Sequence, residues 1–182
     1  MTQKILKDFV VQIREAAAAE DRKSAIRELL QDSQSRKVLM ADAIAALEED
    51  EVMFFEDETC SIWTCRYDPN VVFAPHEHGM GVHIAVYRGT EVEVLYKRAP
   101  GKLRHGGNTL VKAGDVVRLG PDAIHAITAD GSEQSIAIHV YEGPLTQIER
   151  SLFDWTTGEE VEFSMENFYA MARRKVDMDE FC

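Results

Sequence analysis

Short strand-like segments separated by turn signals fill the middle of the chain, and this pattern constrains the fold more than any other feature. Between residues 51 and 145, segments rich in Val, Ile, Tyr and Phe alternate with breaks rich in Gly, Pro, Asn and Asp. The clearest segments are SIWTCRY, VHIAVYRG, EVEVLYKR and QSIAIHVY, whereas APGKLRHGGN is typical of a loop with a hairpin turn at Gly106-Gly107. Strands and turns at this density predict an antiparallel β-barrel or sandwich.

Helical patterns are found on both sides of this region. Apolar residues recur at helical spacing at Ile5, Leu6, Phe9, Val10 and Ile13, and again near residues 26–30 and 38–47. We therefore expect residues 1–50 to form helices that pack on a barrel of residues 51–145. Residues 146–182 are expected to form a C-terminal extension of the same single domain, with one helix over residues 164–175.

Charge and cysteine content limit the partners and the compartment. The chain has 182 residues with 20 basic and 32 acidic side chains, which gives a formal net charge of −12. An acidic surface repels phosphates, so nucleic acids and membrane surfaces are disfavoured as partners. No apolar run is long enough to span a bilayer, and the first residues do not resemble a secretory signal. Cys60, Cys65 and Cys182 are an odd number without metal-type spacing, which indicates reduced thiols in a cytoplasmic protein.

Histidines are concentrated on the predicted strands. His76 and His78 are two positions apart, so on a strand both imidazoles project from the same face and can share one divalent cation. A third ligand must come from another strand. His125 is the natural candidate, because it follows the Gly120-Pro121 turn and lies early on the next strand. His105, in the glycine-rich segment, is expected to be solvated.

The whole pattern over about residues 70–130 resembles the two histidine motifs of the cupin superfamily. It consists of Pro75 before the His-x-His pair, then a strand, a Gly turn, GDVV, a Gly-Pro turn and a histidine. The resemblance implies a mainly β fold, a cupin double-stranded β-helix (jelly-roll barrel) with an N-terminal helical segment. It also implies that His76, His78 and His125 bind a metal ion.

The carboxylate that many cupins carry after the His-x-His pair is missing, since no Asp or Glu occurs between Gly79 and Gly89. Strand alternation leaves either Val82 or His83 facing inward there, so His83 is either a fourth ligand or a residue that points away. A three-His set keeps the full charge of the ion and favours anionic ligands. Fe(II) suits oxygen chemistry there, whereas Zn suits hydration, and Ni or Mn also accept such ligands.

The strand SIAIHVY offers candidate catalytic residues. Alternation places Ile136, Ile138 and Val140 on one face and Ser135, Ala137, His139 and Tyr141 on the other. A His-x-Tyr after a three-His site is similar to the cysteine dioxygenase family and its thiol dioxygenase relatives, in which a Ser-His-Tyr relay lies beside the iron. The resemblance implies an Fe(II)-dependent dioxygenase that oxidises a small thiol with dioxygen. Tyr141 would hydrogen-bond the bound oxygen or thiolate and His139 would orient the phenol, whereas Ala137 occupies the serine position.

Two departures from that family concern the substrate and a cross-link. The cysteine that animal-type members cross-link to the tyrosine is replaced here by Val82 or His83, so no cross-link is expected. Family members that act on cysteine or mercaptopropionate hold the substrate carboxylate with an arginine upstream of the barrel, but the stretch EVMFFEDETCSIW has none. A thiol without a carboxylate, or a different small substrate, therefore fits these residues better.

Two other classes of function agree with the same residues. One is a metal-dependent cupin enzyme of another type, such as a hydrolase or isomerase that uses Zn, Mn or Ni. The other is a non-catalytic cupin in which the barrel binds a small ligand. A homodimer formed through edge strands agrees with either class, and the sequence alone does not decide between them.

Overall fold

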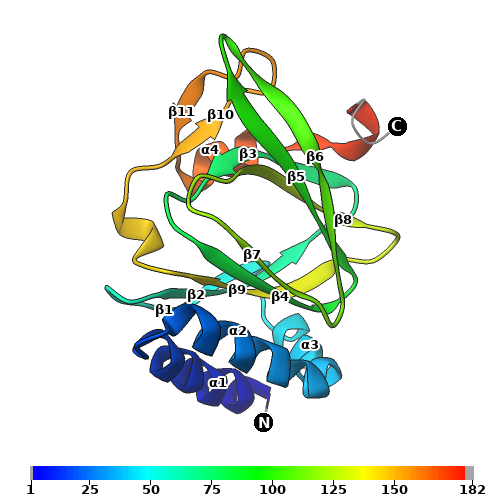
Figure 1. The fold of residues 1–182 in the computed structure, drawn as a ribbon. Coiled ribbons are helices and arrows are strands. Elements are labelled where there is room, and N and C mark those ends of the chain that lie inside the picture. Colours follow the sequence, from blue (N-terminus) through cyan, green and yellow to red (C-terminus); the bar gives the residue numbers. More distant parts are fainter. Residues whose placement is uncertain (1, 179–182) are drawn as a thin grey trace.

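Two antiparallel sheets pack face to face in the computed structural model, which describes residues 2–178 (Figure 1). The first sheet has the order β1 (Glu51–Glu56), β2 (Ser61–Tyr67), β9 (Ser135–Tyr141), β4 (Val82–Arg88) and β7 (Val116–Leu119). The second has the order β11 (Glu160–Glu162), β10 (Ser151–Phe153), β3 (Val71–Glu77), β8 (Ile124–Asp130), β5 (Thr90–Ala99) and β6 (Lys102–Lys112), and β12 (Arg173–Arg174) also pairs with β3.

The strand order identifies the architecture. The central strands of the sheets have the orders β2-β9-β4-β7 and β3-β8-β5-β6, so the chain passes repeatedly from one sheet to the other. This arrangement of eight antiparallel strands is the jelly roll, or double-stranded β-helix. The expected fold class, a mainly β double-stranded β-helix (jelly-roll barrel) with an N-terminal helical segment, is confirmed.

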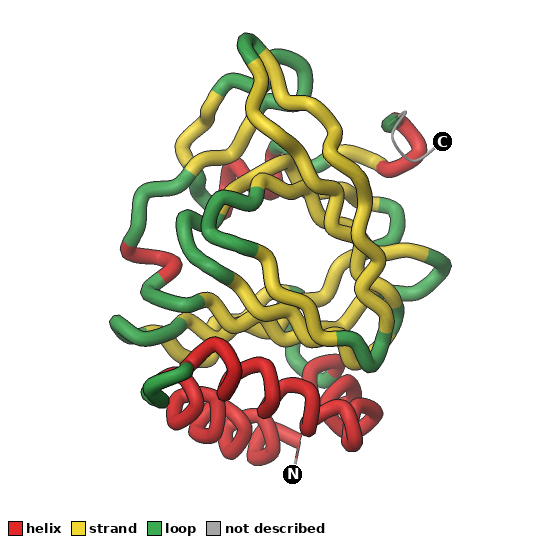
Figure 2. Tube along the Cα trace, viewed as in Figure 1, coloured by secondary structure: helices red, strands yellow, loops and turns green. Residues whose placement is uncertain are grey.

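Three helices cover the outer face of the first sheet (Figures 1 and 2). They are α1 (Thr2–Ala17), α2 (Arg22–Ser33) and α3 (Lys37–Ala45), and the short 3-10 turn η1 (Gln34–Arg36) joins the last two. Their apolar residues form one buried cluster with the outward-facing side chains of β9; the cluster includes Phe9, Ile13, Ile26, Ile44, Ile136, Ile138 and Val140. Among residues 2–178, no helix has the length and apolar composition needed to cross a bilayer.

The segment APGKLRHGGN is not a loop, which corrects the expectation from its glycines. β5 and β6 form a long hairpin whose turn includes Gly101, with φ of +70°. Gly107 has φ of +124° and lies at a bulge, because Leu95 pairs with Gly107 while Tyr96 pairs with His105. A positive φ favours glycine at a bulge as much as at a turn, so the glycine pair did not mark the turn.

The C-terminal part of the chain crosses the end of the second sheet (Figure 1). The turn η2 (Leu145–Gln147) leads into the hairpin β10–β11, then α4 (Met165–Ala170), β12 and the turn η3 (Lys175–Asp177). The helix expected over residues 164–175 is therefore shorter. It begins at Ser164, whose hydroxyl accepts a hydrogen bond from Asn167, and it ends before Arg173 because that backbone pairs with Val72 of β3.

Candidate metal centre

Three histidines meet inside the barrel at the end of β3. His76 lies on β3 opposite His125 of β8 in the strand register, and His78 follows the last residue of β3. The possible ligand atoms of the three side chains all lie within 4.8 Å of one another, and all three residues are buried. The fold thus brings together the three imidazoles that the sequence analysis selected, from strands 47 residues apart.

Hydrogen bonds determine which ring nitrogen of His76 and of His125 remains available to a cation. Nδ1–H of His76 donates to the backbone oxygen of Ala74 at 2.9 Å, which leaves Nε2 as the ring's free donor atom for a cation. Nδ1–H of His125 donates to the carboxylate of Glu93, and its Nε2 lies 3.3 Å from Nε2 of His78. Nitrogen atoms bound to one ion at about 2.1 Å lie roughly 3.0–3.4 Å apart, so this pair is already at that spacing.

The electrostatics of the cluster favour neutral imidazoles at His76 and His78. Burial, together with the charge of His125, lowers the pKa of both His76 and His78 well below the ordinary histidine value. Both rings are therefore neutral near pH 7 and keep lone pairs for a metal. Nδ1 of His78 is buried without a hydrogen-bond partner among the described residues. Among the described residues the His78 ring thus has no hydrogen-bond partner except His125, so its Nε2 atom is available to a divalent cation shared with that ring.

The other two candidate histidines lie elsewhere. His83 is buried on the helix-facing side of β4, where Nε2 lies 3.1 Å from Glu142. It lines a cavity of about 430 Å³ with residues of α2 and β7, including Arg27 and Arg118, and is not part of the three-His cluster. His105 is exposed on β6 and bonds with Asn108. Of the two alternatives for His83, the geometry favours the residue that points away.

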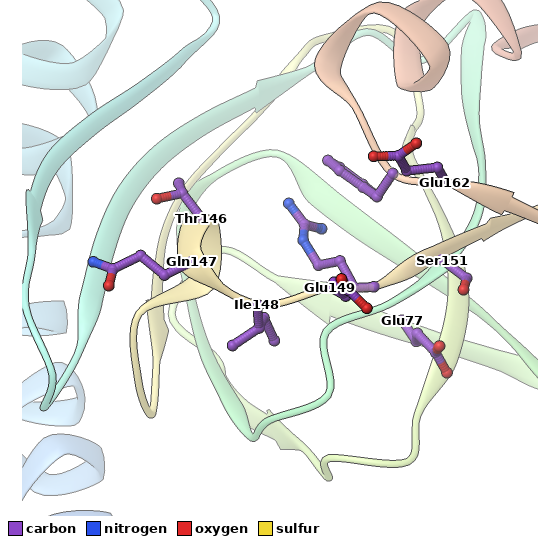
Figure 3. Close-up of a pocket in the computed structure, with 9 residues that line it drawn as sticks. Glu77, Thr146, Gln147, Ile148, Glu149, Ser151 and Glu162 are labelled. Carbon is purple, nitrogen blue, oxygen red and sulfur yellow. The ribbon is translucent and has the colours of Figure 1, made fainter.

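A small cavity lies directly beside the cluster. Its volume is about 30 Å³, roughly the space of one water molecule. It is lined by His76, His78, Glu51, Trp63, Cys65, Tyr67, Tyr141, Leu145, Arg150, Phe163, Met165 and Phe168. Two of these residues, Arg150 and Phe163, also line a surface cleft of about 710 Å³. Figure 3 shows that cleft, with Glu77, Glu149 and Glu162 around it. The Arg150 and Phe163 side chains therefore separate the inner cavity from the outer cleft.

Arg150 is a functional candidate that the sequence analysis missed. Its guanidinium lies 3.3 Å from the centre of the Phe163 ring and forms no ion pair with any carboxylate in the described part of the chain. Burial lowers its pKa to about 10, so the group still carries its positive charge at pH 7. A cation with no carboxylate at ion-pair distance among the described residues, lining the same cavity as His76 and His78, is suited to bind an anionic group of a small molecule. The family resemblance pointed to the stretch EVMFFEDETCSIW before the barrel strands, whereas Arg150 follows the barrel.

His139 and Tyr141 reach the same region from β9. Nδ1 of His139 lies 3.4 Å from the Tyr141 hydroxyl, and the Tyr141 ring stands edge-on to His78 with ring centres 4.9 Å apart. The strand has the expected alternation, since Ala137 and Tyr141 pack inside the barrel while Ile138 packs under the helices. Only Tyr141 of the two candidates lines the cavity, and His139 lies behind it.

Two buried carboxyl groups on β5 were also missed. Glu91 and Glu93 have no exposed surface, and they alternate with Val92 and Val94. Glu91 accepts a hydrogen bond from Nε2 of His139 at 3.0 Å, and Glu93 accepts one from His125. Burial raises the pKa of Glu91 to about 7; burial also opposes ionisation of Glu93, but His125 holds its pKa below the ordinary value. Alternation alone would have placed the valines inside, because it does not show that both faces of β5 are covered.

The cysteines occupy two different environments. Cys60 is buried in the cluster beneath the helices, and Cys65 is buried on the inner side of β2, where it lines the cavity. Both are free thiols. Burial raises the pKa of each thiol, so neither is a thiolate at neutral pH. Cys182 lies outside the described residues.

Comparisons with known proteins give structural neighbours only. No protein family model and no curated protein matches this chain. A solved Klebsiella pneumoniae protein, described as uncharacterized with a double-stranded β-helix domain, is 20% identical, covers 58% of this chain and 81% of its own, and has a TM-score of 0.45. A cupin superfamily protein from Desulfitobacterium hafniense is 15% identical over 57% of this chain and 86% of its own, with a TM-score of 0.44. An E162A mutant of Bacillus subtilis oxalate decarboxylase is 19% identical over 54% of this chain and 26% of its own, with a TM-score of 0.41. The fold assignment rests on the strand order described above.

Proposed function

We propose that this protein is a metal-dependent enzyme, a mononuclear Fe(II) oxygenase that oxidises a small thiol with dioxygen. His76, His78 and His125 would hold the ion. Bound Fe(II) would supply the redox chemistry and leave coordination positions for the thiolate and dioxygen. The convergence of three buried imidazoles on one point, with no carboxylate among them and a small cavity beside His76 and His78, carries this proposal.

The absence of an acidic ligand bears on the type of substrate. An ion held by three neutral nitrogens keeps its full positive charge, so an anionic ligand gains more from binding there than at a site with a carboxylate. A thiolate is such a ligand. The carboxylate of Glu93 contacts the far side of the His125 ring and so orients that ring without occupying a ligand position.

Arg150 supports a substrate with an anionic group. Its unpaired guanidinium lines both the inner cavity and the surface cleft. A substrate whose thiolate reaches the three imidazoles could place a carboxylate on Arg150, as a short mercapto acid would. The sequence analysis favoured a thiol without a carboxylate because it found no arginine upstream of the barrel. The position of Arg150 removes that reason.

Two residues of β9, Tyr141 and His139, also support the proposal. The Tyr141 ring borders both the cavity and the His78 ring, so its hydroxyl is suited to hydrogen-bond a bound substrate. His139 holds that hydroxyl through Nδ1. In this arrangement Tyr141 is the group proposed to touch substrate, and His139 positions it.

An oxygen-uptake assay tests the proposal. The protein is loaded with Fe(II) under anaerobic conditions, its iron content is measured, and dioxygen consumption is followed with cysteine, 3-mercaptopropionate and cysteamine. We expect uptake that depends on the thiol and is stoichiometric with the oxidised product. No thiol-dependent uptake at full iron occupancy would overturn the oxygenase assignment.

A second candidate is a metal-dependent enzyme of the hydrolase or isomerase type that uses Zn, Mn or Ni. The pairing of His125 with Glu93 favours it, because a carboxylate–histidine pair is also common around catalytic zinc. Metal analysis of protein purified without added metal separates the two. Retained zinc, together with inactivity towards thiols, would favour this second candidate.

A further inference from the structure

Glu91 is a buried carboxyl group of β5 that lies next to His139, and the sequence pattern did not indicate this contact. Its carboxylate lies 3.0 Å from Nε2 of His139, on the side of the ring opposite Tyr141. Neither Glu91 nor His139 has more than 1% of its surface exposed. The titratable groups around His139 include Glu51 on β1, Cys65 and Tyr67 on β2, His76 and His78 at the end of β3, Glu91 and Glu93 on β5, and Tyr141 on β9.

The protons on His139 decide what the Tyr141 hydroxyl can do. If Nδ1 of His139 has no proton, it accepts the hydrogen of Tyr141, whose oxygen then offers only lone pairs to the cavity. If Nδ1 carries a proton, it donates to the Tyr141 oxygen, and the phenolic hydrogen is free to donate into the cavity. The two states present opposite hydrogen-bonding groups to a ligand beside His78.

We propose that Glu91, through its bond to Nε2 of His139, keeps a proton on Nδ1, so that Tyr141 acts as a hydrogen-bond donor towards the metal cavity. Glu91 is thus a positioning residue. It acts through His139 on Tyr141, and it lies on β5, outside the strand that carries the other two groups. The catalytic consequence of this inference rests on the proposed function, but the proton placement does not.

Charge and burial around the ring support this assignment. Burial by itself opposes a charged imidazole, but the surrounding acidic groups, Cys65 and Glu91 first, raise the pKa of His139 well above the ordinary value. Burial raises the pKa of both the Cys65 thiol and Glu91, so neither group favours an uncompensated negative charge here. The buried Glu91–His139 pair therefore favours zero net charge, with two protons shared between the carboxyl group and the ring. Proton transfer along the Glu91–Nε2 bond leaves Nδ1 protonated in either position of that proton. Ala137, which lies two residues before His139, has no side-chain group that could serve instead.

The substrate class follows from the direction of this bond. A donor at Tyr141 stabilises a ligand that presents lone pairs or negative charge beside His78, such as a thiolate or a reduced oxygen species. It does not favour a ligand that presents a hydroxyl or amine hydrogen there. Together with Arg150, the cavity would then offer positive or hydrogen-donating groups on both sides of the ligand position.

Nitrogen-15 NMR of the metal-free protein tests the proton placement without any assay of activity. The ring nitrogens are labelled, and the signals of His139 are assigned by comparison with His139→Gln. At pH 7 we expect Nδ1 of His139 to be protonated, whether Nε2 is also protonated or shares its proton with Glu91. A ring protonated only on Nε2 would overturn the proposal, even if the protein proves to be a thiol oxygenase.

Three variants test whether Glu91 is the group that keeps a proton on Nδ1 of His139. In Glu91→Gln the carboxylate charge is lost, and we expect the second ring proton to leave at a pH at least one unit lower than in the unmodified protein. In Glu91→Asp the charge remains, so Nδ1 should stay protonated at pH 7, and this variant decides the matter if Glu91→Gln does not fold. Tyr141→Phe should leave the His139 titration within half a unit. An unchanged titration in Glu91→Gln, or loss of the Nδ1 proton in Glu91→Asp, would contradict the role of Glu91.

Discussion

Nε2 of His78 and Nε2 of His125 lie 3.3 Å apart, although the two residues are 47 positions apart in the chain. Two buried rings whose nitrogen atoms face each other at this spacing are stabilised by a shared proton or a shared cation.

Removal of one imidazole should abolish tight metal binding. We expect His78→Ala to lower the metal content of protein reconstituted with one equivalent of Fe(II) or Zn to below a tenth of the normal value, because two nitrogens remain where three converge. His83→Ala is the matched control, since His83 is equally buried but faces α2. Equal metal loss in both variants, measured by elemental analysis, would contradict the assignment of the ligands.

Glu93→Gln should weaken metal binding without removing a ligand. The variant keeps the size of the side chain but loses the charge that orients His125, and such changes typically cost about 10- to 100-fold in metal affinity. Competition with a chelator of known affinity measures the change. Glu133→Gln, on an exposed loop, should bind metal normally, and an unchanged affinity in Glu93→Gln would show that the contact has no such role.

Arg150→Gln should discriminate between thiols. For a thiol that carries a carboxylate we expect KM to rise about 10- to 100-fold, which corresponds to the roughly 1.5–3 kcal/mol of a hydrogen bond to a charged group. For cysteamine, which has no carboxylate, KM should change less than threefold. Arg104→Gln, which alters an exposed arginine on β6, serves as the control. A parallel rise for both kinds of thiol would mean that Arg150 acts on cavity shape and not on charge.

Glu56 should stabilise the segment that carries Arg150 in a pH-dependent way. Its carboxylate accepts hydrogen bonds from Ser61 and from the backbone and side chain of Thr146. Although burial opposes this, these bonds lower the pKa of Glu56 below its ordinary value. For an acid with a lowered pKa, the stabilisation is present above the ordinary pKa and disappears as pH falls through the lowered one.

The Glu56 effect can be measured by urea unfolding at several pH values. We expect Glu56→Gln to reduce the free energy of unfolding by about 1 kcal/mol at pH 7, and the difference from the unmodified protein to shrink below about pH 4. Glu58→Gln, on the same turn but exposed, should have little effect at either pH. A Glu56→Gln deficit that is the same at pH 7 and pH 3 would show that charge is not its cause.

The helical layer should be part of the cooperative fold. Phe9 of α1 is 1% exposed and packs in the cluster beneath the first sheet. Phe9→Ala should therefore lower the free energy of unfolding by about 3–5 kcal/mol. Val11 lies on the same helix but is 50% exposed, so Val11→Ala should cost less than about 0.5 kcal/mol. Chemical denaturation followed by circular dichroism measures both.

Local patterns were informative where the two faces of an element differ in chemistry in the expected way. Helical spacing found the apolar residues of α1, which has one buried face. Both faces of β9 are buried, but alternation still separated Ile138, which packs under the helices, from Tyr141, which lies inside the barrel. The same logic fails on β5. Glu91 and Glu93 lie inside the barrel and the intervening valines are covered as well, so neither polarity nor alternation indicates which side faces the cavity.

The glycines of the β5–β6 hairpin also could not be assigned to a turn or a bulge from the local sequence. Gly101 and Gly107 both have positive φ, and from the sequence either one could form the hairpin turn. The register of β5 against β6 makes the first the turn and the second the bulge. This choice depends on pairing over ten residues of two strands, which is a property of the sheet and not of the local sequence.

By itself, the amino-acid sequence determined an antiparallel β-barrel or sandwich with a helical layer, and it selected the three histidines, because strand alternation and turn spacing are local and repeat along the chain. The jelly-roll form was implied by the resemblance to the cupin histidine motifs. Only the tertiary structure decided which charged groups surround those histidines. Arg150 reaches the cavity from a segment that follows the barrel, and Glu91 contacts His139 across 48 positions of chain. Such contacts join parts of the chain that no short-range pattern relates, and they exist only after the two sheets and the C-terminal segment have packed together.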